Sequence, residues 1–260
     1  MPYWHKQALL LLGMLLPAAP GKTADILHLA TLAYPPFCDQ EQPDGGALVA
    51  ITRAAFARQG IRMQLTVLPW PRLVSQLRQG RFDGVIGVWS TDLAAMKLRA
   101  GSPVFHSLVG FYLQQHSSLS MDKPGALRGK RAGIVQGYNY SARVLQSGLL
   151  FEQARDDETN LRKLQLGRLD VAIVEKAVGD SLLATQRLRQ GRLLRWGGAV
   201  LAVEPLAVGF ASGSSQDYWH AQFESGLQKL KQDGQYLRMV QAAGLQEYLP
   251  LAAGNARPAH

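Results

Sequence analysis

The 260-residue chain contains one cysteine, Cys38, so it cannot form an internal disulfide and must be held together by packing. We expect Cys38 to be a small buried side chain beside "YPPF" rather than a nucleophile. The six histidines lack the close spacing that metal ligands show. We therefore expect neither a metal nor a cofactor.

Long hydrophobic runs are also absent. The apolar run from Ala8 to Leu16 is shorter than the about 20 residues that a membrane-spanning helix needs, and no later segment is apolar enough. It follows the positive charge of Lys6 and precedes small residues, an order typical of a secretory signal peptide, here residues 1–24. Cleavage after Gly21 and after Ala24 both stay open. We expect a periplasmic mature protein without a lipid anchor, since no cysteine lies near the cleavage site.

Basic residues outnumber acidic ones by 28 to 19, but they are scattered rather than gathered in a tail or a nucleic-acid-binding motif. The densest cluster is "RLRQGRLLR" at 187–195, which we interpret as a solvated helix end or loop. We therefore expect no nucleic-acid partner. A hydrophobic content of 47% argues against disorder and indicates a globular protein.

A weak internal repeat links two segments of the chain. Residues 77–90, "LRQGRFDGVIGVWS", match residues 164–177, "LQLGRLDVAIVEKA", with Leu, Gly, Arg, Asp and Ile in the same register. Each copy follows a helical pattern, turns at a glycine, passes an aspartate and enters an apolar run. The repeat predicts a helix–turn–strand unit used in two related lobes. A chance match of short strings is the alternative.

Strand and helix patterns alternate through the rest of the chain. Residues 25–33 and 62–69 are predicted strands, residues 47–60 a helix, and residues 129–146 a strand, a glycine turn and a helix. This alternation predicts an α/β fold with mainly parallel sheets and helices on both faces. Ligands of such sheets bind beyond the carboxyl ends of the strands, which Ser90 and Glu175 follow.

Five motifs in order resemble the periplasmic solute-binding proteins of polar amino-acid ABC transporters, the family 3 type. They are "YPPF" at 34–37, "PWPRLVSQLRQGRFDGVIG" at 69–87, "LRGKRAGIVQGYNY" at 127–140, "LQLGRLDVAIVE" at 164–175 and "LQKLKQDGQYLRMV" at 227–240. The resemblance implies a two-lobed Venus flytrap of type II. Its first lobe would comprise residues 25–113 and 205–250, its second residues 114–204, followed by a tail at 251–260.

The resemblance also implies how the protein works. A monomer would bind a small molecule between its lobes, close around it, and deliver it to an inner-membrane ABC permease or to a sensor. Tyr34 and Trp70 match the two aromatic residues that sandwich the ligand in the family, and their flat faces suit aliphatic stems or cations. Trp89 is a further candidate contact. The alternative is that these are core aromatics, with Trp70 bracing a loop between two prolines.

The resemblance implies three polar contacts near the strand ends. Ser90 matches a ligand-contacting serine, and Asn139 takes the place of a threonine that holds the ligand carboxylate. Tyr138, which is bulkier than the family's usual residue, is expected to narrow the cleft or to contact the ligand. Together these positions support a small polar or amino-acid-like ligand.

Family members place an arginine a few residues after the first strand end, where its planar fork grips the ligand carboxylate. Here Ala94 or Ala95 stands at that position. Arg99 lies about one helical turn later and precedes Phe105 by the family's usual interval, so a short insertion would restore its role. The alternative is that Arg99 is a solvated helix residue and that the clamp is lost.

Glu175 matches the acid that pairs with the ligand's α-ammonium in the family, since a buried cation needs a hydrogen-bonded counter-charge. The alternative is a surface glutamate paired with Lys176 or Arg168. Glu175 is also the one obvious acid for an enzyme on this fold, such as a cyclohexadienyl dehydratase, although no second acid–base group stands out nearby. We expect a binding protein rather than an enzyme, with a sensor that takes no part in import as a further alternative.

Overall fold

The structure is a computed structural model of the chain. It describes residues 26–119, 125–185, 188 and 193–250. The signal peptide and the C-terminal tail that we expect at the two ends lie outside these ranges. Within them, no helix has both the length and the apolar character needed to cross a membrane.

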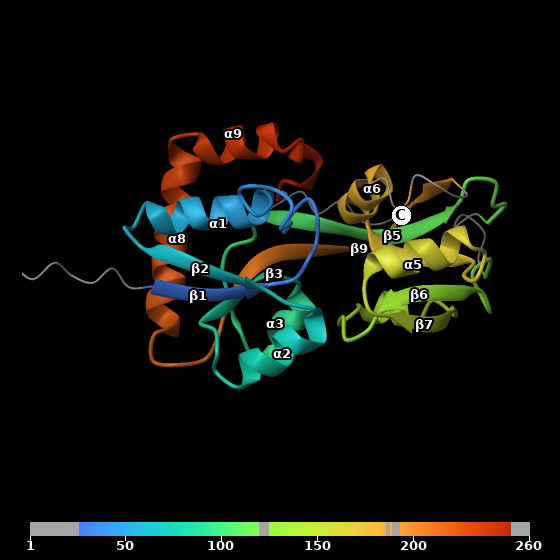
Figure 1. Cartoon of the computed structure of the whole chain (residues 1–260), viewed down its shortest axis with the longest axis horizontal. Coiled ribbons are helices and arrows are strands. Elements are labelled where there is room, and N and C mark those ends of the chain that lie inside the picture. Colours follow the sequence, from blue (N-terminus) through green and yellow to red (C-terminus); the bar gives the residue numbers. More distant parts are fainter. Residues whose placement is uncertain (1–25, 120–124, 186–187, 189–192, 251–260) are drawn as a thin grey trace, which may run out of the picture.

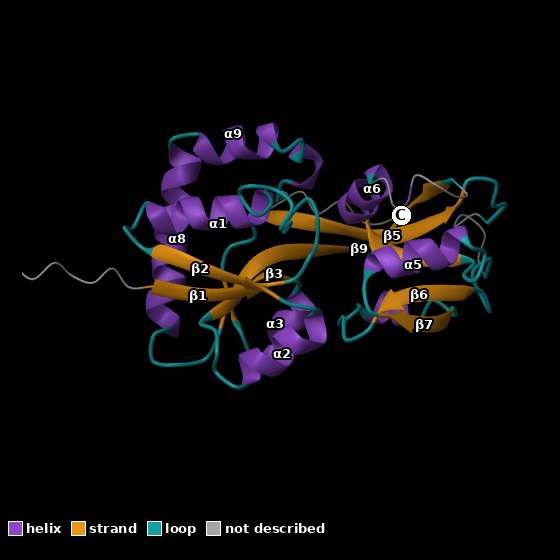
Figure 2. Ribbon diagram, in the orientation of Figure 1, coloured by secondary structure: helices purple, strands orange, loops and turns teal. Residues whose placement is uncertain are grey.

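The first lobe is built on three parallel strands. β1 (Ile26–Thr31) lies between β2 (Arg62–Val67) and β3 (Gly84–Val88), and the crossovers are α1 (Ala47–Ala57) and α2 (Trp70–Arg78). All five residues of β3 are buried, as expected for a strand whose sheet is covered on both faces. Helices lie on the two sides of this sheet in Figure 2.

The second lobe repeats this strand order. β6 (Arg131–Val135) lies between β7 (Leu150–Ala154) and β8 (Val171–Glu175), and it pairs in parallel with both. The crossover helices are α4 (Ala142–Leu145) and α5 (Asp157–Gln165). The helix predicted after the "GYNY" turn is therefore present but only four residues long.

The repeated helix–turn–strand unit is confirmed in both lobes. α2 leads into β3 and α5 leads into β8, each through a glycine with positive φ. The aspartate of each copy accepts a hydrogen bond from the neighbouring central strand: Asp83 Oδ2 from the His28 N–H and Asp170 Oδ2 from the Arg131 N–H, both at 2.8 Å. The aspartate of the repeat thus bonds to the central strand of each lobe, β1 in the first and β6 in the second.

Two long strands join the lobes. β5 (Phe105–Gln114) and β9 (Leu194–Phe210) pair with each other along most of their length and run from one lobe to the other in Figure 1. β9 is antiparallel to β3, and β5 is antiparallel to β8, which gives the strand order β2-β1-β3-β9-β5-β8-β6-β7. The sheets are thus mixed, with antiparallel pairing at the junction. Our division of the chain at 113/114 and 204/205 stays a prediction.

The C-terminal helices return to the first lobe, where α8 (Gln216–Gln232) packs on α1 and α9 (Gln235–Ala242) follows it. Gly226 of α8 lies so close to the Ala55 backbone of α1 that a Cβ atom would not fit. The second lobe carries α6 (Lys176–Ala184) against β5. The other elements of the described ranges are α3 (Ser90–Met96), β4 (Arg99–Ala100) and a 3₁₀ turn at Gln246–Tyr248.

Candidate functional site

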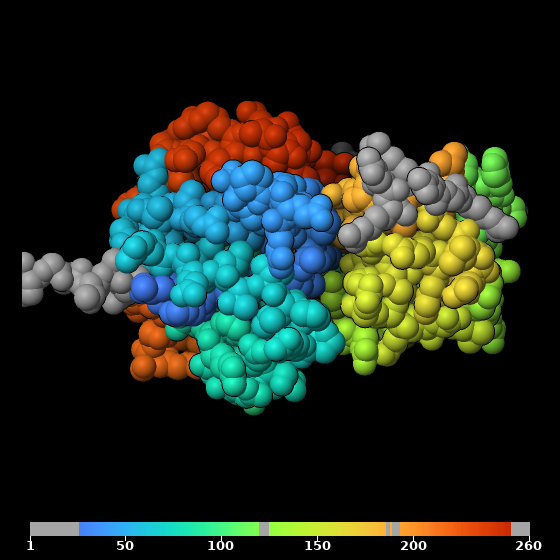
Figure 3. Space-filling model, viewed as in Figure 1, coloured from blue at the N-terminus to red at the C-terminus, as the bar shows by residue number. Residues whose placement is uncertain are grey.

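A small cavity lies where the two lobes meet, and the boundary between the lobes is visible in Figure 3. Tyr138 supplies the wall from the second lobe. The walls from the first lobe are Leu32, Tyr34, Trp70, Gly87, Trp89 and Asp92. These residues lie at the carboxyl ends of β1, β2 and β3, the edge where ligands bind in α/β sheets.

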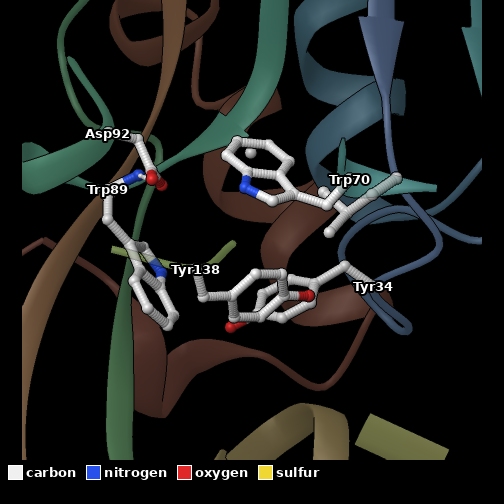
Figure 4. Close-up of a pocket in the computed structure, with 7 residues that line it drawn as sticks. Tyr34, Trp70, Trp89, Asp92 and Tyr138 are labelled. Atoms are coloured by element: carbon white, nitrogen blue, oxygen red, sulfur yellow. Dashed lines mark hydrogen bonds between the residues drawn. The ribbon is translucent and has the colours of Figure 1, made fainter. Parts of the chain in front are cut away.

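Tyr138 fills most of the space between the aromatic rings. Its ring centroid lies 6.0 Å from that of Trp70 and 5.6 Å from that of Trp89, both in edge-to-face geometry. In Figure 4 the Trp89 ring lies to the left of the Tyr138 ring, the Trp70 ring lies above it, and Tyr34 enters the same region from the right. The free volume of about 10 Å³ has room for roughly one water molecule. In this conformation the second lobe itself occupies the aromatic site.

Three hydrogen bonds connect the lobes around this cavity. The Trp70 indole Nε1 donates to the Gly137 carbonyl at 2.9 Å, and the Thr91 hydroxyl donates to the Asn139 carbonyl at 2.5 Å. The Asn139 side-chain amide donates to Asp92 Oδ1 at 2.7 Å. The predicted contact Asn139 is therefore at the site, but it is engaged by the first lobe. We call these three bonds the interlobe latch.

Ser90 is close to the site without lining the cavity. Its hydroxyl donates to Glu204 Oε2 at 2.6 Å, on the long strand β9. The neighbouring Trp89 indole donates to the Ser107 hydroxyl at 3.2 Å. The Tyr34 hydroxyl lies beside the Ser107 side chain, but it makes no hydrogen bond of normal geometry to any described residue, although Tyr34 is only 3% exposed. A buried hydroxyl without a normal hydrogen bond thus remains at the cavity wall.

Glu175 is buried rather than on the surface. Its side chain is engaged by two backbone N–H groups: Leu108 of β5 at 3.1 Å and Val178 of α6 at 2.8 Å. Burial raises the pKa of Glu175 to about 8, and the backbone donors partly counteract this. The alternative pairing with Lys176 is wrong, because that ammonium pairs with Asp180 at 3.0 Å. Glu175 does not line the cavity, and its hydrogen bonds join α6 to β5.

Arg99 does not reach the cavity. α3 ends at Met96, Lys97 adopts a left-handed conformation with φ of 54°, and Arg99 lies in β4, paired with Phe210 of β9. Its guanidinium forms an ion pair with Asp217 of α8 on the surface. In this structure Arg99 thus lies three residues beyond the end of α3 and away from the cavity, and its role as a carboxylate clamp stays a prediction.

Two aspartates that sequence reasoning did not select lie at the site. Burial raises the pKa of Asp92 to about 6, although hydrogen bonds from Asn139 and the Trp89 N–H partly offset it. Burial, and then the charge of Asp156, raise the pKa of Asp157 to about 7, while the Tyr138 hydroxyl acts in the opposite direction. Both stand in the first turn of a helix, where an acid is usually a capping residue, so their sequence positions gave no functional signal.

The cavity continues outward between the lobes. One cleft of about 340 Å³ shares Leu32, Trp70 and Tyr138 with the cavity. A second cleft, of about 540 Å³, shares Ala33, Gln40 and Asp156 with the first cleft and reaches α6. Carboxylates line both clefts. Within the described ranges, no set of three or more His, Cys, Asp or Glu side chains is arranged to hold a metal ion. Burial raises the pKa of Cys38 to about 12, which makes its thiol a poor nucleophile.

A family model described as Bacterial extracellular solute-binding proteins, family 3, matches residues 27–244. The chain belongs to this family. A crystal structure of a histidine kinase sensor domain with similarity to periplasmic binding proteins matches this solute-binding protein with a TM-score of 0.76 at 21% identity. That match covers 88% of this chain and 99% of the sensor domain.

Two further solved structures share the fold. The substrate-binding protein of an amino acid ABC transporter has a TM-score of 0.71 at 22% identity and covers 85% of this chain and 100% of its own. The GluR0 ligand-binding core from Nostoc punctiforme, in complex with L-glutamate, has a TM-score of 0.70 at 18% identity. That match covers 84% of this chain and 99% of the ligand-binding core. No curated protein matches the sequence. The two-lobed type II fold of this solute-binding protein is thereby established.

Proposed function

We propose that this solute-binding protein captures a small polar or amino-acid-like solute between its lobes, in the periplasm and as a monomer, and presents it to an inner-membrane ABC permease. The observation that carries the proposal is the cavity walled by Tyr34, Trp70 and Trp89 from one lobe and Tyr138 from the other. A molecule bound there contacts both lobes, so its binding favours the closed arrangement.

The aromatic rings and the interlobe latch supply the binding mechanism. When the lobes part, Tyr138 leaves the rings of Trp70 and Trp89, and a solute takes its place against the flat ring faces. Closure then excludes water and places buried polar groups in contact with the solute. Members of this fold family with known ligands support a small solute: one neighbour is described in complex with L-glutamate.

We propose binding without chemical conversion. Glu175, the acid that a dehydratase would need, does not line the cavity and is engaged by two backbone N–H groups. Incubation with prephenate or arogenate is expected to give no product. A sensor role would use the same cavity, so deletion of the gene separates the two: loss of uptake of the bound solute supports import, and unchanged uptake supports sensing.

A thermal-shift panel of amino acids, polyamines, organic acids and short peptides tests the binding function. A ligand that binds only the folded state raises the melting temperature. With that ligand, Trp70→Ala is expected to weaken affinity by about tenfold or more, because a large stacking surface is lost. Arg99→Ala is expected to change affinity less than about twofold, since its partner is Asp217 on the surface. A panel without any shift, or a larger effect of Arg99→Ala, would contradict the proposal.

A further inference from the structure

We infer that the solute held between the lobes is an organic cation that carries no carboxylate group, an inference that rests on the proposed function. The cleft is negative although the chain has 28 basic and 19 acidic residues. Among the described residues lining the cavity and its two adjoining clefts, Arg155 is the one basic group, and it is paired with Asp156 at 2.9 Å. The carboxylates that line them are Asp39, Glu41, Asp92, Asp156, Asp157 and Glu158.

Two of these carboxylates are buried without a counter-charge in the part of the chain that the structure describes. Asp92 is 5% exposed and is held by Asn139 and the Trp89 N–H, and Asp157 is 6% exposed beside the Tyr138 hydroxyl. A carboxylate removed from water is stabilised by a neighbouring cation. An ammonium group entering between the lobes would supply that cation.

The aromatic walls of the cavity also favour a cation. The rings of Tyr34, Trp70 and Trp89 stand around one space, and an ammonium or guanidinium group is attracted to the negative faces of such rings. The buried Tyr34 hydroxyl would accept an N–H from the same group. A donor on the solute would thus give this buried hydroxyl a hydrogen bond that the described residues do not supply with normal geometry.

Two helix N-termini of the second lobe that could bind a carboxylate are already capped by acids of this chain. At the N-terminus of α5, Asp156 accepts from the Thr159 N–H at 2.8 Å, and at that of α6, Glu175 accepts from the Val178 N–H at 2.8 Å. Anions bind helix N-termini through these same donors. With alanines at the family's arginine position and Arg99 paired elsewhere, a solute carboxylate would be buried beside Asp92 without a partner.

Matched pairs of small molecules test the inference by isothermal titration calorimetry on the mature protein. Agmatine is arginine without its carboxylate, and cadaverine is lysine without its carboxylate. At least one of the two amines is expected to bind about tenfold or more tightly than its parent amino acid. Parent amino acids that bind as tightly as the amines, or a site that accepts only acids or neutral peptides, would overturn the inference and leave the proposed function intact. Failure of every compound would overturn both.

Cleft variants give a second test with agmatine or cadaverine as the probe. Asp157→Asn is expected to weaken binding by about tenfold or more, and Glu41→Gln at the exposed mouth by a smaller factor that shrinks at high salt. If Asp157→Asn folds poorly, Glu41→Gln still tests the inference, because Glu41 is exposed and its replacement does not disturb the core. Asp217→Asn is the matched control, since this carboxylate is 82% exposed on α8, outside the cleft. Equal effects of cleft and control variants would contradict the inference.

Discussion

Asp92, Asp157 and Glu175 lie near the junction of the lobes, and burial raises the pKa of each, to about 6, 7 and 8 respectively. A carboxyl group whose pKa is higher in the folded chain than in the unfolded chain binds its proton more tightly in the folded state. Its contribution to the free energy of unfolding is unchanged at low pH, falls as the pH rises from the unfolded to the folded pKa, and stays low above that.

Asp157 provides the residue-scale prediction. Its pKa rises from 3.8 to about 7, so it should lower the free energy of unfolding progressively between about pH 4 and pH 7. Between about pH 4.5 and pH 8, the free energy of unfolding of the wild type should fall by on the order of 3 kcal/mol relative to that of Asp157→Asn, as measured by urea unfolding.

Asp170→Asn is the control for Asp157, because Arg131 holds the pKa of Asp170 below its usual range. Its contribution has the opposite sign: stabilisation is present above the usual pKa of an aspartate and is lost as the pH falls through the lowered one. The same direction of pH dependence in both variants would contradict the assignment.

At the scale of elements, the Glu175 side chain connects three of them: β8, α6 and β5. It ends β8, caps the first turn of α6 and accepts from the Leu108 N–H of β5, where the long strands pass between the lobes. Asp156 caps α5 in the corresponding way through the Thr159 N–H, but no hydrogen bond between its side chain and β5 is found among the described residues. A comparison of variants at Asp156 and Glu175 therefore distinguishes the loss of a helix cap from the loss of the contact at the junction.

We expect Glu175→Ala to lower the free energy of unfolding by on the order of 2 to 3 kcal/mol. A lost helix cap accounts for about 1 kcal/mol, and an unsatisfied buried N–H at Leu108 for the rest. Asp156→Ala, which loses the cap and the exposed ion pair with Arg155 but no contact at the junction, should cost about 1 kcal/mol. Chemical denaturation of both variants at one pH measures the difference, and equal losses would argue against a role of Glu175 at the junction.

At the scale of the whole molecule, the lobes are joined by β5 and β9 and closed by the interlobe latch. Each latch bond contributes about 0.5 to 1.5 kcal/mol to the closed arrangement. The cavity between the closed lobes holds no more than about one water molecule, because Tyr138 and the latch residues bring its walls together. A solute must therefore compete with these internal contacts.

The double variant Thr91→Val with Asn139→Ala removes two latch bonds and should shift the closed-to-open ratio by roughly tenfold toward the open form. Small-angle X-ray scattering of the solute-free protein would then give a larger radius of gyration. Ser102→Ala is the control, because its hydroxyl bond to Glu224 at 2.6 Å joins two parts of the first lobe. Unchanged scattering from the double variant, or equal opening in the control, would contradict the latch.

Much of the fold was predictable from local patterns. The repeated Gly-Arg-x-Asp units, the strand patterns and the helix predicted at 47–60 reappear as elements of the structure, the helix ending at Ala57, because each depends on residues close together in the sequence. The end of α3 was not predictable. Lys97 ends that helix without a glycine, and β4 forms because Phe210, more than a hundred residues later, lies beside Arg99.

The sequence by itself determined the family, the alternation of strands and helices, and the aromatic residues beyond the strand ends, since these are properties of short segments and their order. Only the tertiary structure decided which charges meet. It pairs Arg99 with Asp217, buries Glu175 against the backbone of α6 and β5, and brings Asp92 of one lobe toward Asn139 of the other. Burial and electrostatic pairing depend on neighbours far apart in the chain, and those two quantities set the chemistry of the cleft.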